Sequence, residues 1–328
     1  MKFSVRWLAA PVAAAMVLVA APPQATAAPA RTKLAAQQQG ALILFDPPLG
    51  QTLRYRWETV EERRGATTTS WEVSSLRFEA AEDGYRLFVV PESSGNDIAD
   101  PARKAMLEHF AELTRRPYSV RLDAEGQMLG IENEEALWAE LVRTIEAAYD
   151  DLATGRTPEV REGLRRLSSV FRDMPAETRR NMMLQGIGPL VEFAGTETRT
   201  GEPIDASIEQ PAPFGGTVRR NVRITLERVQ GDLAHLSIFS EVPDEEIAAP
   251  PARVIGAVTG ESGGGDAEAR IRALANEAEG LRNETRASFR VRLDTGLTEE
   301  MRSTESTVAG SGEGRERVLK IVTMRRLD

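Results

Sequence analysis

The chain has 328 residues, of which 41 are basic and 50 acidic, and it contains no cysteine. The formal net charge of −9 argues against nucleic-acid binding, which needs a dense basic surface. The lack of cysteine excludes disulfides, thiolate metal sites and a thiol nucleophile, and a chain of this length can fold without cross-links.

The first 27 residues have the layout of a secretory signal peptide. Lys2 and Arg6 make a basic start, an apolar run follows over residues 7–21, and Ala25-Thr26-Ala27 offers small residues for cleavage. The apolar run is shorter than the roughly 20 residues that a membrane-spanning helix needs. The sequence therefore predicts a periplasmic or secreted protein with no transmembrane anchor after cleavage. An uncleaved N-terminal anchor is the alternative.

A flexible segment is expected over residues 28–50, followed by a first β-rich unit over residues 51–132. Leu53, Tyr55 and Trp57 alternate with polar residues, which is typical of a half-buried strand. Asp83-Gly84 predicts a hairpin turn. A change in the parity of the apolar residues predicts a bulge near Ser74-Ser75.

Helices are expected at two places in the middle of the chain. Asp100 and Pro101 predict the start of a short helix within the first β-rich unit. A longer helical insertion is expected over residues 133–194, beginning at Asn133, with further helix starts at prolines and a break at Gly188-Pro189.

Residues 195–328 are expected to form a second β-rich unit that is related to the first. The run Ser119 to Gly126 is similar to Arg290 to Gly296, since both contain Val-Arg-Leu-Asp followed by a glycine turn. Each unit also runs strand, turn, strand, helix, strand, turn, strand. These features favour a duplicated β-meander–helix–hairpin unit over a chance similarity of two turns.

This layout resembles a group of uncharacterised bacterial exported proteins built from two β-rich repeats. More loosely, it is similar to the lipoprotein-carrier half-barrel, in which a curved antiparallel sheet wraps helices around an apolar cavity. The resemblance rests on element order and the two hairpins, and it covers most of the chain after residue 27. It implies an α+β fold with a curved antiparallel sheet from two related halves and the helical insertion packed on one face.

Catalytic chemistry has little support in the sequence. The two histidines, His109 and His235, have no Gly-x-Ser-x-Gly elbow to accompany them, and each is interpreted as a surface or hydrogen-bonded histidine. No spacing typical of a metal site or a phosphate-binding loop occurs, so no cofactor is expected. The chain is therefore expected not to be an enzyme, and a hydrolase is the least favoured of the functions considered.

The candidate site lies in the methionine-rich, glycine- and proline-interrupted part of the insertion. Methionine adapts to irregular apolar partners and is over-used on binding surfaces. The candidate ligand-binding residues are Met182, Met183, Ile187, Leu190 and Phe193. They predict a non-catalytic binding or carrier protein of the cell envelope for an apolar ligand or a partner protein. A structural or interaction module, in which these residues are ordinary core, is the alternative.

Overall fold

The computed structural model describes residues 40–63, 65–98, 104, 116–155, 157–184, 186–211, 217–243, 282–309 and 316–327. The expected signal peptide, His109 and most of the expected helix after Asp100 lie outside these ranges.

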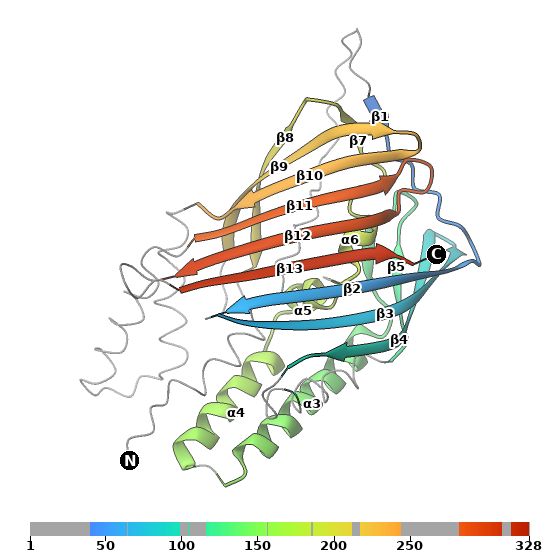
Figure 1. Cartoon of the computed structure of the whole chain (residues 1–328). Helices are drawn as coiled ribbons and strands as arrows, with labels where there is room; N and C mark the ends of the chain where they lie inside the picture. Colours follow the sequence, from blue (N-terminus) through green and yellow to red (C-terminus); the bar gives the residue numbers. More distant parts are fainter. Residues whose placement is uncertain are drawn as a thin grey trace.

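A large antiparallel sheet of 11 strands dominates the fold, in the order β6-β5-β4-β3-β2-β13-β12-β11-β10-β9-β8. The sheet is strongly curved, and the helices lie on one side of it or beyond its end (Figure 1). Its strands are β2 (Thr52–Arg63), β3 (Ala66–Ala81), β4 (Gly84–Asn96), β5 (Tyr118–Leu122), β6 (Met128–Ile131), β8 (Ile204–Pro211), β9 (Thr217–Gln230), β10 (Leu233–Glu241), β11 (Arg282–Arg292), β12 (Thr298–Ala309) and β13 (Glu316–Arg326). The predicted α+β class with a curved antiparallel sheet is confirmed.

The two β-rich units meet where β2 pairs with β13, for example Trp57 with Met324. The two similar hairpin turns lie against one segment of the chain. A Cβ added at Gly126 would be 2.7 Å from the Phe45 ring, and one added at Gly296 would be 2.3 Å from the carbonyl oxygen of Leu44. Both turns therefore approach the same segment, while the duplication itself stays a prediction.

A register shift lies near the expected bulge, but the extra residue is Glu92 on β4 and not a residue of β3. Toward β4 the register shifts between Val73 and Ser74, whereas toward β2 the pairing runs unbroken. The change of parity in the sequence therefore does not come from a bulge in β3. It arises because apolar side chains of this strand lie on both faces of the sheet. Trp71 faces the opposite side of the sheet from Leu76, and the Arg56 guanidinium lies 4.7 Å from its ring centroid.

Residues 40–50, which were expected to belong to a flexible segment, are instead an ordered part of the fold. β1 (Gly40–Leu42) pairs with β7 (Glu197–Arg199), and the side chains of Ile43 and Phe45 are buried. The Leu44 amide donates to the carbonyl oxygen of Leu293 at 2.9 Å. The sequence of residues 28–50 does not reveal that residues 40–50 are ordered, because the residues they contact, in β7 and at Leu293, lie far away in the sequence.

The insertion forms α3 (Glu134–Ala153), α4 (Pro158–Arg172), α5 (Ala176–Leu184) and α6 (Gly188–Val191). The predicted starts after Asn133 and at Pro158 are confirmed, although Asn133 has a φ of 59° and its side chain makes no capping hydrogen bond. α5 and α6 lie behind the sheet in Figure 1, whereas α3 and α4 lie beyond β4.

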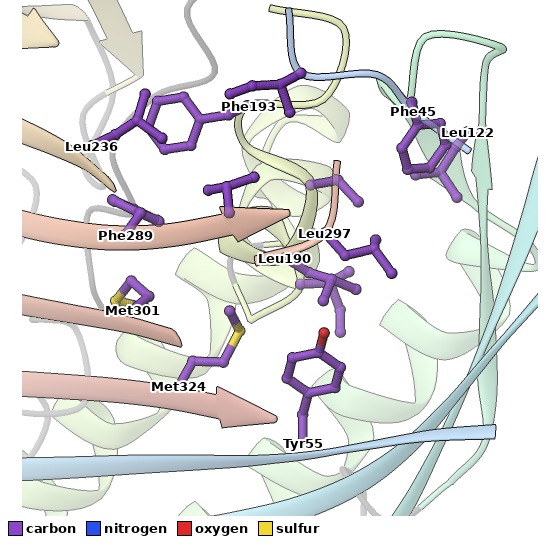
Figure 2. Packing of buried hydrophobic residues seen from close by; sticks show 14 of the residues in the cluster. Phe45, Tyr55, Leu122, Leu190, Phe193, Leu236, Phe289, Leu297, Met301 and Met324 are labelled. Carbon is purple, nitrogen blue, oxygen red and sulfur yellow. The ribbon is translucent and has the colours of Figure 1, made fainter. Parts of the chain in front are cut away.

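The side of the sheet that packs against α6 is called the inner face here. Its apolar side chains join those of α6 and of residues 41–45 in one cluster, the sheet cluster. Figure 2 shows Phe193 near Leu236 and Phe289, and Leu190 near Leu297 between Met324 and Phe45. A smaller group, the helical cluster, contains Trp138, Val142, Ile145, Tyr149, Ala153, Phe171 and Met174.

Candidate ligand-binding site

The structure brings the five candidate residues together along α5 and α6, but in two different environments. Ile187, Leu190 and Phe193 are at most 3% exposed and belong to the sheet cluster. The Phe193 and Phe289 rings pack edge to face with centroids 5.0 Å apart. These three side chains therefore hold α6 against the sheet.

Met182 and Met183 remain half-buried at the end of α5. Met182 packs against the helical cluster, whereas Met183 packs against both the helical cluster and the sheet cluster. Met183 therefore lies at the junction of the two apolar groups, with part of its flexible side chain open to solvent. Met182 and Met183 are therefore the two positions among the five where an apolar ligand could add contacts without displacing core side chains, and Met183 is the one that contacts both clusters.

A second group of functional interest lies on the inner face, farther along the strands from α6. It consists of polar and charged side chains at positions whose neighbours on the same face are apolar. This group, called the polar row here, contains Arg220, Ser240, Asn283, Thr285, Glu305 and Lys320. Arg220 is 4% exposed, and Glu305 and Lys320 are each 8% exposed. Charged side chains are almost never buried to this degree unless they have a specific role or partner.

Cross-strand pairing aligns much of the polar row. Ser240 on β10 pairs with Thr285 on β11, Thr285 pairs with Glu305 on β12, and Glu305 pairs with Lys320 on β13. Cross-strand partners have Cβ atoms about 4.5–5.5 Å apart. The side chains of the row are therefore close neighbours although they come from separate strands.

Arg220 and Asn283 link the row by hydrogen bonds. The Arg220 guanidinium donates to Ser240 Oγ at 3.1 Å, to Asn283 Oδ1 at 2.8 Å and to Thr285 Oγ1 at 3.3 Å. Asn283 Nδ2 donates to Glu305 Oε1 at 2.8 Å and to Thr307 Oγ1 at 2.9 Å. Asn283 thus connects the guanidinium to the carboxylate.

Burial sets the electrostatics of the row. Desolvation lowers the pKa of Arg220 and that of Lys320, and the nearby charge of Glu305 partly opposes both shifts. Glu61, the cross-strand neighbour of Lys320 on β2, acts on Lys320 in the same direction as Glu305. The row therefore holds two cations at a cost in solvation energy.

Sequence reasoning missed the polar row, although a signal for it was present. Arg220 has the parity of Val222, Ile224 and Leu226 on β9, all of which face inward. Lys320 likewise shares the parity of Met324 on β13. Charged residues at the inward parity of otherwise apolar strands would have indicated the row.

The opposite face of the sheet carries ordinary solvated charge pairs and His235. Arg223 and Asp205 are joined at 2.7 Å, and Arg290 and Glu300 at 2.7 Å. Desolvation together with Arg228 and Arg290 lowers the pKa of His235.

The described part of the chain contains no group of three or more His, Cys, Asp or Glu residues placed to hold a metal ion. None of its helices is long and apolar enough to span a membrane.

Comparisons with known proteins give little on which to base a family. No protein-family model matches the chain, and no curated protein matches its sequence. One similar solved structure is described as "lipid-protein interactions in lipovitellin", with a TM-score of 0.41 and 7% sequence identity. The match covers 86% of this chain and 26% of that one, so the chain spans about a quarter of its length. A likeness of this degree does not establish a shared family.

Proposed function

We propose that this chain is an exported, non-catalytic binding or carrier protein of the cell envelope, which takes an apolar ligand beside α5. The observation that carries the proposal is the position of Met183, half-buried at the junction of the sheet cluster and the helical cluster. A flexible thioether adapts to apolar partners of irregular shape. The basic start, apolar run and Ala25-Thr26-Ala27 support export to the periplasm or the exterior.

The alternative, a structural or interaction module, has an observation of its own. Ile187, Leu190 and Phe193 are buried as completely as the centre of the sheet cluster, as expected for ordinary core. The two proposals differ in what is left for a ligand to contact. A carrier needs apolar surface that becomes covered on binding, and Met182 and Met183 are the candidate residues that offer it.

The test combines variants with an apolar, environment-sensitive dye and with mass spectrometry of lipids extracted from the native protein. Met183→Ser should weaken dye binding at least several-fold with a small change in melting temperature, because the side chain is only half-buried. Leu190→Ser should lower the free energy of unfolding by about 2–5 kcal/mol, because it removes a fully buried side chain and adds a hydroxyl. Leu129→Ser is the matched control, since Leu129 is 45% exposed on β6.

Two results would favour the module instead. The wild-type protein would bind no dye and would carry no co-purified lipid. The second result is that the wild-type protein binds dye but Met183→Ser changes neither dye binding nor melting temperature by more than Leu129→Ser does.

A further inference from the structure

The polar row lies directly beyond apolar residues of the inner face. Ser240 follows Ile238 on the same face of β10, and Thr285 precedes Ala287 on the same face of β11. Alternate residues of a strand share a face and are about 7 Å apart. An elongated molecule lying along these strands would therefore contact apolar side chains with one part and the polar row with another.

The Arg220 guanidinium is buried among neutral partners. Its hydrogen bonds go to two hydroxyls and one amide oxygen, on Ser240, Thr285 and Asn283. Within the described part of the chain, no carboxylate forms an ion pair with it. Hydrogen bonds between guanidinium groups and anions are stronger than those to neutral oxygens, especially where water is excluded. An anionic group from a ligand would thus give Arg220 a directly bonded charged partner, which the described residues do not supply, since Glu305 acts on it only from a distance.

Glu305 presents the complementary group. Its Oε1 atom accepts from Asn283, whereas Oε2 is buried and has no hydrogen-bond partner among the described residues. Buried polar atoms nearly always have a partner, so an unpaired carboxylate oxygen in a native protein needs an explanation. A hydrogen-bond donor from a ligand would satisfy Oε2 at a point that Asn283 links to Arg220.

We propose that the polar row receives the headgroup of an amphiphile that combines a negative charge with a hydrogen-bond donor, as phosphoethanolamine does. The anion contacts the Arg220 guanidinium, and the donor contacts Glu305 Oε2. The apolar chain lies toward α6, so this inference rests on the proposed function and specifies its ligand. Binding at this row requires no metal and no covalent step.

The test measures the affinity of the full mature chain for ligands that share a twelve-carbon chain and differ in the headgroup. The headgroups are phosphoethanolamine, phosphocholine and maltoside. Phosphocholine keeps both charges of phosphoethanolamine but has no N–H donor, and maltoside is uncharged. Titration calorimetry below the micelle concentration should rank phosphoethanolamine at least tenfold tighter than the other two.

Variants assign that preference to the two groups. Arg220→Gln should weaken binding of phosphoethanolamine at least tenfold while leaving maltoside unchanged. Glu305→Gln should remove the preference for phosphoethanolamine over phosphocholine. The matched controls are Arg223→Gln, on the outer face of the same strand, and Glu284→Gln, on the outer face of β11; both should keep the wild-type ranking.

Each contrary result has a separate meaning. Equal affinity of the wild-type protein for all three headgroups, together with normal dye binding, would overturn the headgroup site and leave the carrier proposal standing. Equal affinity for all three headgroups in a wild-type protein that binds no dye would overturn both the headgroup site and the carrier proposal. If free phosphoethanolamine, which has no apolar chain, bound as tightly as the twelve-carbon ligand with the same headgroup, the assignment to an amphiphile would be overturned. If Arg220→Gln does not fold, the wild-type ranking of headgroups decides the question.

Discussion

Glu72 and Glu92 lie on neighbouring strands but experience opposite environments. Glu72 on β3 is at an inner-face position and accepts a hydrogen bond from Ser74 Oγ at 2.7 Å. Burial raises the pKa of its carboxyl, and the hydrogen bond only partly opposes this effect. Glu92 lies at the register shift of β4, where hydrogen bonds from Arg54 and Ser75 lower the pKa of its carboxyl.

These opposite shifts predict opposite pH dependences of stability. A carboxyl whose pKa is raised by folding stabilises the protein below the pKa of the unfolded chain, about 4.5, and this contribution is lost as the pH rises through the folded pKa. Glu72→Gln should therefore gain stability relative to the wild type as the pH rises above about 4.5. Glu92→Gln should lose stability relative to the wild type as the pH rises to that value, because the pKa of Glu92 is lowered.

Urea unfolding measures the free energy of unfolding of each variant and of the wild type at a series of pH values. A range of about pH 3 to 8 spans the usual pKa values of carboxyl groups on both sides. Glu92→Gln serves as the control for Glu72→Gln, because both changes remove one carboxylate from adjacent strands. Differences of the same sign for the two variants would show that the burial of Glu72 is not what governs its titration.

At the scale of elements, two glycines illustrate how the hairpin between β11 and β12 is fastened to residues 44–45. Gly296 has a φ of +72°, and a Cβ added there would lie 2.3 Å from the Leu44 carbonyl oxygen. Gly201 has a similar φ of +78°, but an added Cβ would meet nothing within 4 Å. An alanine at either position would be strained by the positive φ, but only an alanine at position 296 would also clash with Leu44.

Gly296→Ala is therefore predicted to be more destabilising than Gly201→Ala. Each alanine should pay roughly 1–2 kcal/mol for its left-handed conformation. Gly296→Ala must in addition displace Leu44, whose amide is hydrogen-bonded to Leu293 in the same hairpin. Urea unfolding of the two variants provides the comparison, and equal losses would contradict the fastening of this hairpin by residues 44–45.

Local signals predicted much of the element pattern but not the long-range pairing. The turn at Asp83-Gly84 and the helix starts at Asn133 and Pro158 depend on nearby residues, and the structure confirms them. The pairing of β2 with β13 and of β1 with β7 depends on partners far along the chain, for which the sequence offered no signal.

The candidate site was predicted in part for the same reason. Helical spacing and glycine breaks identified the segment from Met182 to Phe193, but they could not separate the buried Leu190 from the half-buried Met183. The polar row required strands from distant parts of the chain to be aligned, although the parity of Arg220 on its own strand was informative.

At the scale of the whole molecule, the helical cluster is a small core beside a much larger one. Trp138 Nε1 donates to the Phe171 carbonyl oxygen at 3.2 Å, which joins α3 to α4. Contact between this cluster and the sheet cluster includes the half-buried Met183. Regions with fewer buried apolar contacts open at lower free energy than the main core.

Hydrogen exchange should therefore be faster in α3 and α4 than in β11 and β12. Mass spectrometry of peptides from residues 134–172 and 282–309 measures the two rates under native conditions. Addition of a ligand that contacts Met183 should slow exchange in the helices, since it adds buried contacts at their junction with the sheet. Equal protection of the two regions would show that the helices and the sheet open as one cooperative unit.

The pairing of β2 with β13 also determines how the protein can reach its native state. The Arg63 and Glu316 side chains, joined at 2.9 Å across this pair, are separated by 253 residues in the sequence. Pairing over such a separation carries a large loop-closure entropy and makes folding slow, because early native contacts are few. Until β13 pairs with it, β2 has an open edge of unpaired backbone groups, next to the apolar side chains of Leu53 and Tyr55 on its inner face. Because an unpaired strand edge can pair with other chains, we expect a chain that has not yet placed β13 to aggregate more readily than the folded protein.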